Sequence, residues 1–108
     1  MTEKQAKPAS KPSRQEAVFA TEKASRYLQQ LMKHFAHKTE VDFTPLEGHA
    51  TFPFGEAWLK ADDQSLKITV YGASARDMVQ TRYVVEEHLL RFAFREEPEP
   101  LSWAPVAD

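Results

Sequence analysis

The spacing of apolar residues changes from helical to strand-like and back along this chain. Near the N-terminus, apolar residues recur three and four positions apart, at Ala24, Tyr27, Leu28, Leu31 and Phe35. This spacing predicts a helix from about Glu22 to about His37, with Thr21 as its N-cap. A short apolar run at residues 17–20 precedes the helix and predicts a strand.

The middle of the chain alternates apolar and polar residues, which is typical of strands. The alternating apolar positions are Val41 and Phe43, then Ala50, Phe52 and Phe54, then Ala57, Leu59 and Ala61, then Leu66, Ile68 and Val70. Gly55 is expected to make a tight turn, and residues 62–65 a polar hairpin loop. Period-two alternation predicts an antiparallel sheet with one buried face and one more polar face.

A second helix is predicted from about Ala75 to Phe94, where Ser74 and Asp77 form a capping box. One face of this helix carries Met78, Val85, Leu89 and Phe92. Three or four strands are predicted between the helices, and with three the element order is β-α-β-β-β-α. We predict an α+β fold, a two-layer sandwich in which an antiparallel sheet of about four strands has two helices on one face.

The second helix also carries a second apolar band, formed by Val79, Tyr83, Leu90 and Phe94. A helix that is apolar on two sides contacts two partners. The band is expected to pack on the neighbouring helix and the C-terminal tail, and the alternative is a homodimer interface.

The 108 residues suffice for one domain, expected at residues 16–103. Residues 1–15 are rich in Lys, Ser and Pro and predict a disordered basic tail. Residues 104–108 are expected to be a disordered C-terminal tail, and Trp103 is expected to hold the preceding acidic, proline-rich segment against the fold.

Composition narrows the possible functions. The formal net charge of -2 argues against a general nucleic-acid-binding protein, and the absence of cysteine excludes disulfides and thiol catalysis. There is no apolar run of the roughly 20 residues that a membrane span needs, and the N-terminus lacks the apolar region of a secretory signal. We therefore expect a cytoplasmic protein without membrane association. Signatures of catalysis such as GxSxG and glycine-rich phosphate loops are absent.

Three histidines lie at the borders of the helical apolar faces. If the helices are neighbours, His34 and His88 could meet at the seam between them, with His37 one turn from His34. Such histidines are often hydrogen-bonded to backbone or carboxylate groups for structural reasons. The alternatives are an acid–base role or ligation of a metal or haem, and haem needs only one axial histidine and an apolar slot.

Two further surfaces carry candidate binding residues. Arg91 and Arg95, at i and i+4, either pair with Glu86 and Glu87 or bind an anionic ligand such as a siderophore or a haem propionate. The open face of the sheet should hold His49, Thr51, Trp58, Lys60, Thr69 and Tyr71. With Tyr83 of the second helix, Trp58 and Tyr71 are the expected interaction surface for a partner or a second copy.

The segments RYLQQLMKHFAHK, FPFGEAWLKA and VVEEHLLRFAFREE resemble a bacterial domain-of-unknown-function family, numbered twenty-two eighteen, over about residues 17–103. Similar domains occur fused to siderophore-interacting, FAD-dependent ferric reductases, which implies a role near iron, siderophore or haem. The flavin and nicotinamide machinery of those partners is absent here, so the resemblance does not imply reductase activity. It singles out the same five residues, His34, His37, His88, Arg91 and Arg95.

Three hypotheses follow from these patterns. The first is a non-enzymatic accessory domain that presents its histidine and arginine edge to haem, iron or a siderophore, or to a ferric-siderophore reductase. The second is a homodimeric interaction or regulatory module without a small-molecule ligand. The third is a small enzyme, such as one that degrades haem.

Overall fold

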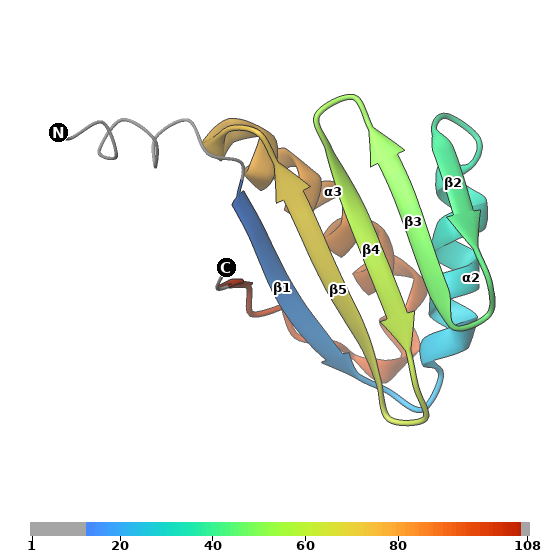
Figure 1. Cartoon of the computed structure of the whole chain (residues 1–108). Helices are drawn as coiled ribbons and strands as arrows, with labels where there is room; N and C mark the ends of the chain where they lie inside the picture. Colours follow the sequence, from blue (N-terminus) through green and yellow to red (C-terminus); the bar gives the residue numbers. More distant parts are fainter. Residues whose placement is uncertain (1–12, 107–108) are drawn as a thin grey trace, which may run out of the picture.

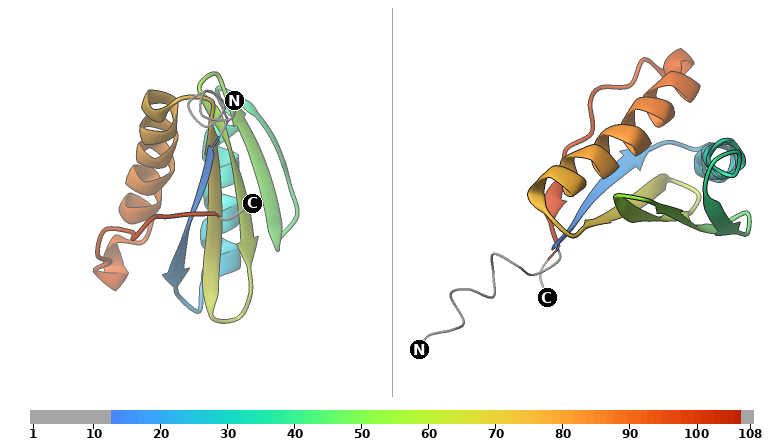
Figure 2. Two further views of the ribbon diagram at one scale, coloured as in Figure 1. Left: turned by 60° about the vertical axis from the view of Figure 1, so that its left-hand side comes forward. Right: turned by 90° about the horizontal axis from the view of Figure 1, so that it is seen from above.

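A computed structural model describes residues 13–106, which form one antiparallel sheet with helices behind it (Figure 1). The elements follow in the order β1 (Ser13–Ala20), α2 (Ala24–Phe35), β2 (Glu40–Phe43), β3 (Glu47–Phe52), β4 (Gly55–Ala61), β5 (Ser65–Gly72), α3 (Ala75–Phe92), the 3-10 helix η2 (Phe94–Glu96) and β6 (Ala104–Pro105). The six strands are ordered β2-β3-β4-β5-β1-β6. Both α2 and α3 cover the same face, while the other face is open (Figure 2).

The predicted α+β class is confirmed, but four strands rather than three lie between α2 and α3. The reason is the turn after β2. The Thr44 hydroxyl accepts hydrogen bonds from the backbone N–H groups of Leu46 and Glu47, at 3.2 and 3.1 Å. This turn reverses the chain, so that residues 40–43 form a separate edge strand paired with β3.

The domain extends further at both ends than the predicted boundaries of 16 and 103. Ser13 to Gln15, expected in the basic tail, pair with β5 through Gly72, Tyr71 and Val70. Residues 104–105, expected in the C-terminal tail, pair with Glu16 and Gln15 of β1. In both cases backbone hydrogen bonding to an existing strand orders the segment. The rest of the two predicted tails, 1–12 and 107–108, lies outside the described residues.

The alternating residues of the strands form the core, as predicted. The face toward the helices carries Ala17, Phe19, Ala50, Phe52, Ala57, Leu59, Ala61, Leu66, Ile68 and Val70, all buried. Leu28, Leu31 and Met32 of α2 and Val85 and Leu89 of α3 are fully buried against them. Each fully buried Leu or Ile contributes about 1.5–3 kcal/mol to folding, so this layer carries most of the stability.

The turns differ in detail from the predictions. The tight turn between β3 and β4 consists of Pro53 and Phe54, and Gly55 is the first residue of β4. Gly55 is needed there because a Cβ atom would lie 2.2 Å from the Tyr71 carbonyl oxygen. The predicted loop at residues 62–65 is confirmed. The Asp62 carboxylate accepts the backbone N–H groups of Gln64 and Ser65, at 2.8 Å each, which lowers the pKa of Asp62.

Both helices are shorter than predicted. Lys23, not Thr21, is the N-cap of α2, and the Thr21 hydroxyl instead accepts the N–H of Lys23 at 3.0 Å. The Ser74 cap of α3 is confirmed, because its hydroxyl accepts the N–H of Asp77 at 3.1 Å. At its far end α3 stops at Phe92, and the chain continues as η2.

The turn into η2 brings Glu96 to α2 and joins the two helices. One carboxylate oxygen of Glu96 accepts the Tyr27 hydroxyl at 2.6 Å and the Thr21 hydroxyl at 2.9 Å. Burial of the phenol, together with the Glu96 charge, raises the pKa of Tyr27 to about 12. We call this group of three residues the Glu96 clasp.

The segment after η2 is held to α3 by Glu86. Its carboxylate accepts the Leu101 N–H at 2.9 Å and the Trp103 indole N–H at 2.8 Å. This confirms that Trp103 fixes the segment to the fold. The second apolar band of α3 is only partly covered, since Val79 and Tyr83 remain exposed. No helix within residues 13–106 is long and apolar enough to cross a membrane.

Candidate functional site: a histidine pocket at the helix seam

A cavity of about 480 Å³ opens where the C-terminal turn of α2 and the middle of α3 meet the β3–β4 turn. Its lining residues are His34, Phe35, His37, Lys38, Thr39, Phe52, Pro53, Phe54, Val84 and His88. We call this cavity the histidine pocket. Its volume lies within the range of small-ligand sites, about 300–1,000 Å³.

The predicted meeting of His34 and His88 is present at this seam. Their ring centroids are 4.4 Å apart and the rings are inclined by 41°. The Glu96 clasp lies at one end of the seam, near the start of α2, and the two histidines contact each other near the end of α2. His37 lies further out, with its ring centroid 6.5 Å from that of His34.

Hydrogen bonding determines the tautomer of His88. Its Nδ1 lies 2.7 Å from the Val84 carbonyl oxygen, which can only accept, so Nδ1 carries the proton. In the neutral ring Nε2 is then a lone-pair nitrogen, and it has no hydrogen-bond partner among residues 13–106. Metal-binding histidines in proteins are oriented in this way, with the second nitrogen donating to a carbonyl or carboxylate.

The other histidine of the pair is held neutral. His34 is exposed on one side, but its ring also packs against His88 and lies 5.7 Å from the Phe92 ring. Local burial lowers the pKa of His34, and the positive charge that a protonated His88 would carry lowers it further. At neutral pH the His34 imidazole is therefore uncharged and can accept a hydrogen bond or coordinate.

Aromatic rings form the inner wall of the pocket. Phe35 and Phe52 meet edge to face with centroids 5.1 Å apart, and Phe52 and Phe54 lie parallel at 5.4 Å. The Phe35 ring also contacts His88, with centroids 5.7 Å apart. The pocket thus combines an apolar wall with imidazole nitrogens at its rim, an arrangement suited to a planar ligand that has a polar or Lewis-acidic centre.

Over residues 16–104 the chain matches the family described as "Uncharacterized protein conserved in bacteria (DUF2218)". The chain belongs to this family. It is also similar to the solution structure of PA4090 from Pseudomonas aeruginosa, with 30% sequence identity and a TM-score of 0.70, over 87% of this chain and 95% of that one. No curated protein matches. The family resemblance inferred from the three sequence segments is thereby confirmed, and the matched residues include both helices and most of the sheet.

In this DUF2218 domain Arg91 forms the predicted intrahelical ion pair, but Arg95 does not lie on the same helix. Arg91 donates to Glu87 at 2.9 Å, one turn away on the exposed side of α3. Arg95 lies beyond the end of α3, in η2, with its guanidinium carbon 5.3 Å from the centre of the Phe94 ring. Since the α-helix ends at Phe92, the i, i+4 relation is lost. Neither arginine lines the histidine pocket, whereas Lys38, which the sequence reasoning overlooked, does.

Among residues 13–106, the histidines of the pocket have no carboxylate partner that would complete a site for a free metal ion. Within residues 13–106, no group of three or more His, Asp or Glu side chains could hold one. Glu87 is paired with Arg91, and Asp42 lies on the open sheet face, opposite His49. The pocket therefore offers imidazole ligands only, and any metal would have to arrive with its other ligands already bound.

The expected interaction residues divide between two surfaces. Trp58 and Tyr71 lie on the open face of the sheet, as predicted from the alternation, and Trp58 is 37% exposed. The His49 ring stacks on Trp58 at 5.1 Å and pairs with Glu56 at 2.7 Å. Tyr83, which is 62% exposed, lies on α3 behind the sheet and does not share this surface.

Proposed function

We propose that this domain is a non-enzymatic binding module that takes haem into the histidine pocket. The observation that supports this proposal best is the orientation of His88. Its Nδ1–H is committed to the Val84 carbonyl at 2.7 Å, which leaves Nε2 as the coordinating atom at the rim of an apolar cavity. Haem supplies the rest of its iron's ligands itself, so a single axial imidazole is enough.

Haem fits this pocket better than a free metal ion or a ferric siderophore does. A free ion would need further protein ligands, which the described residues do not supply. The iron of a siderophore is already enclosed by oxygen donors and has no open position for an imidazole. A porphyrin, in contrast, is planar and apolar over most of its area, which suits the wall formed by Phe35, Phe52 and Phe54.

Charge at the rim supports the same ligand. Lys38 lines the pocket beside the histidines and would face the carboxylates of a bound haem. Because the pKa of His34 is lowered, this residue adds no positive charge next to the iron at neutral pH. The resemblance to domains fused to siderophore-interacting ferric reductases supports a role in iron handling, in which a reductase of that class would be the partner.

The test is a titration of the purified protein with ferric haem, followed in the Soret band. Wild-type protein should bind with a shifted band, and His88→Ala should weaken binding by about tenfold or more and remove the shift, because the axial nitrogen is lost. His49→Ala is the matched control, since it removes a histidine from the opposite face of the sheet. Equal binding by the His88→Ala and His49→Ala proteins, or no binding by wild type, would sink the proposal.

The second candidate function is self-association through α3. Val79 and Tyr83 are 54% and 62% exposed and lie beside Leu101 and Trp103, so the outer side of α3 presents apolar surface. Sedimentation of the ligand-free protein distinguishes the two functions. A stable dimer that dissociates on Tyr83→Lys substitution would favour the interaction module, and a monomer at all concentrations would exclude it.

A further inference from the structure

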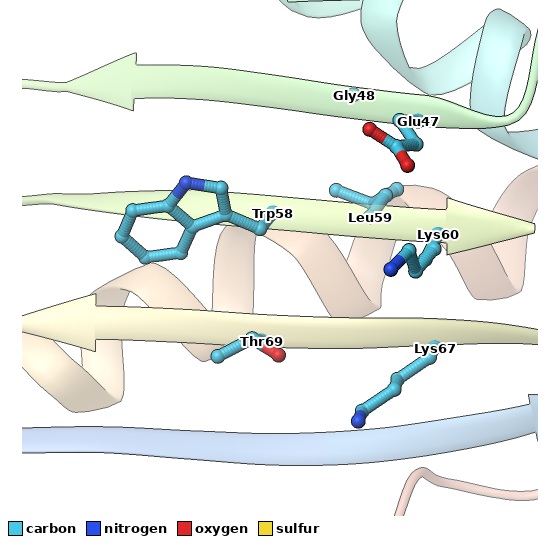
Figure 3. Close-up of a pocket in the computed structure, with 7 residues that line it drawn as sticks. All are labelled: Glu47, Gly48, Trp58, Leu59, Lys60, Lys67 and Thr69. Carbon is cyan, nitrogen blue, oxygen red and sulfur yellow. The ribbon is translucent and has the colours of Figure 1, made fainter.

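The open face of the sheet carries a second cavity, of about 310 Å³, on the side away from the histidine pocket (Figure 3). It is lined by Glu47, Gly48, Trp58, Leu59, Lys60, Lys67 and Thr69, from three neighbouring strands. Trp58 lies at one end, and the three charged side chains lie at the other. The cavity therefore has an aromatic end and a charged end.

Two lysines lie on neighbouring strands at the charged end. The register of β4 and β5 places Lys60 directly opposite Lys67, and like charges in that position repel. Lys67 is partly compensated by Glu16 at 3.4 Å. Lys60 forms no ion pair with any residue of the described part of the chain, although Glu47 is its register partner on β3. In Figure 3 the Lys60 ammonium group is turned toward Trp58, and that of Lys67 reaches toward β1, which carries Glu16.

Trp58 is held in place by its neighbours. His49 stacks on it with the two rings inclined by only 20°, and Glu56 anchors His49 at 2.7 Å. Trp58 and Lys60 are two residues apart on one strand and point to the same face, so their Cα atoms are about 6.8 Å apart. A ring stacked on the exposed part of Trp58 would carry its substituent toward Lys60.

We propose that this cavity binds a small aromatic anion, with its ring against Trp58 and its anionic group between Lys60 and Lys67. A phosphate has enough oxygens to meet both ammonium groups at once, which would relieve their repulsion, and the Thr69 hydroxyl lies between the two ends. Nucleoside monophosphates and aryl phosphates share this chemistry. A long polyanion does not fit, because Glu40, Asp42, Glu56 and Glu16 point from the same face around the cavity.

Fluorescence of Trp58 tests this inference in a Trp103→Phe background, which removes the other tryptophan from every protein compared. The test ligands are AMP and phenyl phosphate. Adenosine and inorganic phosphate are the control ligands, because adenosine has the ring without the anion and phosphate has the anion without the ring. We expect saturable quenching by AMP, by phenyl phosphate or by both, and binding at least roughly tenfold weaker for adenosine and phosphate, since each makes half of the contacts.

Charge variants make the test specific. Lys60→Ala should weaken binding about fivefold, and Glu47→Gln should tighten it about twofold, because the two side chains carry opposite charges at one register position. Lys33→Ala, at an exposed lysine of α2, is the control and should change nothing. Equal affinities for the Lys60→Ala and Lys33→Ala proteins, or no quenching by either phosphate ester, would overturn the inference. Haem binding should be unaffected by Lys60→Ala, so the two proposals fail separately.

Discussion

Replacing Tyr27 by phenylalanine should loosen the seam between α2 and α3 by removing one hydrogen bond of the Glu96 clasp. The ring of Tyr27 is buried and would keep its packing against Phe19, with centroids 6.2 Å apart. Only the hydroxyl, which donates to Glu96 at 2.6 Å, is lost. The perturbation is therefore confined to a single contact between η2 and the first turn of α2.

The size of the effect follows from the charge of the acceptor. Hydrogen bonds to charged groups contribute about 1.5–3 kcal/mol, and the exposed position of Glu96 favours the lower end, about 1.5 kcal/mol. For a domain of this size such a loss lowers the melting temperature by roughly 6–12 °C. Glu96→Gln keeps an acceptor oxygen but removes its charge, so it should cost less, about 0.5–1 kcal/mol.

Urea unfolding of both single variants and the double variant measures the coupling between Tyr27 and Glu96. We expect a coupling free energy of roughly 1 kcal/mol. Tyr83→Phe is the matched control, because Tyr83 is exposed and makes no hydrogen bond to any residue of 13–106. In Glu96→Gln the Tyr27 pKa should fall from about 12 toward the ordinary tyrosine value of 10.0. A Tyr27→Phe loss no larger than that of Tyr83→Phe would refute the reasoning.

Two further predictions concern pH and the glycines. The fold lowers the pKa of His34 below the ordinary histidine value of 6.5, so the unfolded chain takes up the proton first as the pH falls. Stability should therefore fall as the pH drops below about 6.5, and a urea midpoint that declines equally in His34→Gln would contradict this. Gly55→Ala should cost about 1–3 kcal/mol, because its Cβ would meet the Tyr71 carbonyl at 2.2 Å. In Gly48→Ala the new Cβ would meet side-chain atoms only, the nearest being the Met32 sulfur at 3.0 Å, so this variant should lose less stability in the same urea assay. Equal losses in the two variants would contradict this reasoning.

The two layers of the fold could be predicted because apolar periodicity reports burial directly. Strands β4 and β5 alternate without interruption, and α2 keeps one apolar face. The ends of the sheet could not be predicted from the sequence. Ser13 to Glu16 have no apolar alternation and are ordered by backbone pairing with β5. The residue at which α3 ends could not be predicted from the sequence either. Phe94 continues the helical spacing, but the chain leaves the helix at Phe92, and the turn into η2 places Glu96 against Tyr27.

The candidate site could likewise be predicted only in part from the sequence. His34 and His88 lie at the borders of apolar faces, so two adjacent helices bring them together. The wall of the pocket was not predictable, because Phe52 and Phe54 reach it through a β-turn whose position depends on the pairing of β3 with β4. The prediction for the position of Arg95 was wrong because the helix was expected to run beyond Phe92. Lys38 lies four residues after His34 in the sequence, in the turn that follows α2. That spacing was the signal that could have identified it.

Paramagnetic broadening in the NMR spectrum of the full chain tests most directly whether haem occupies the histidine pocket. On addition of ferric haem, signals of His34, His88 and Phe52 should broaden and disappear, because these residues surround the proposed iron position. Signals of Trp58 and Thr69, on the opposite face of the sheet, should persist. Broadening centred on Trp58, or an unchanged spectrum, would contradict a haem site between α2 and α3.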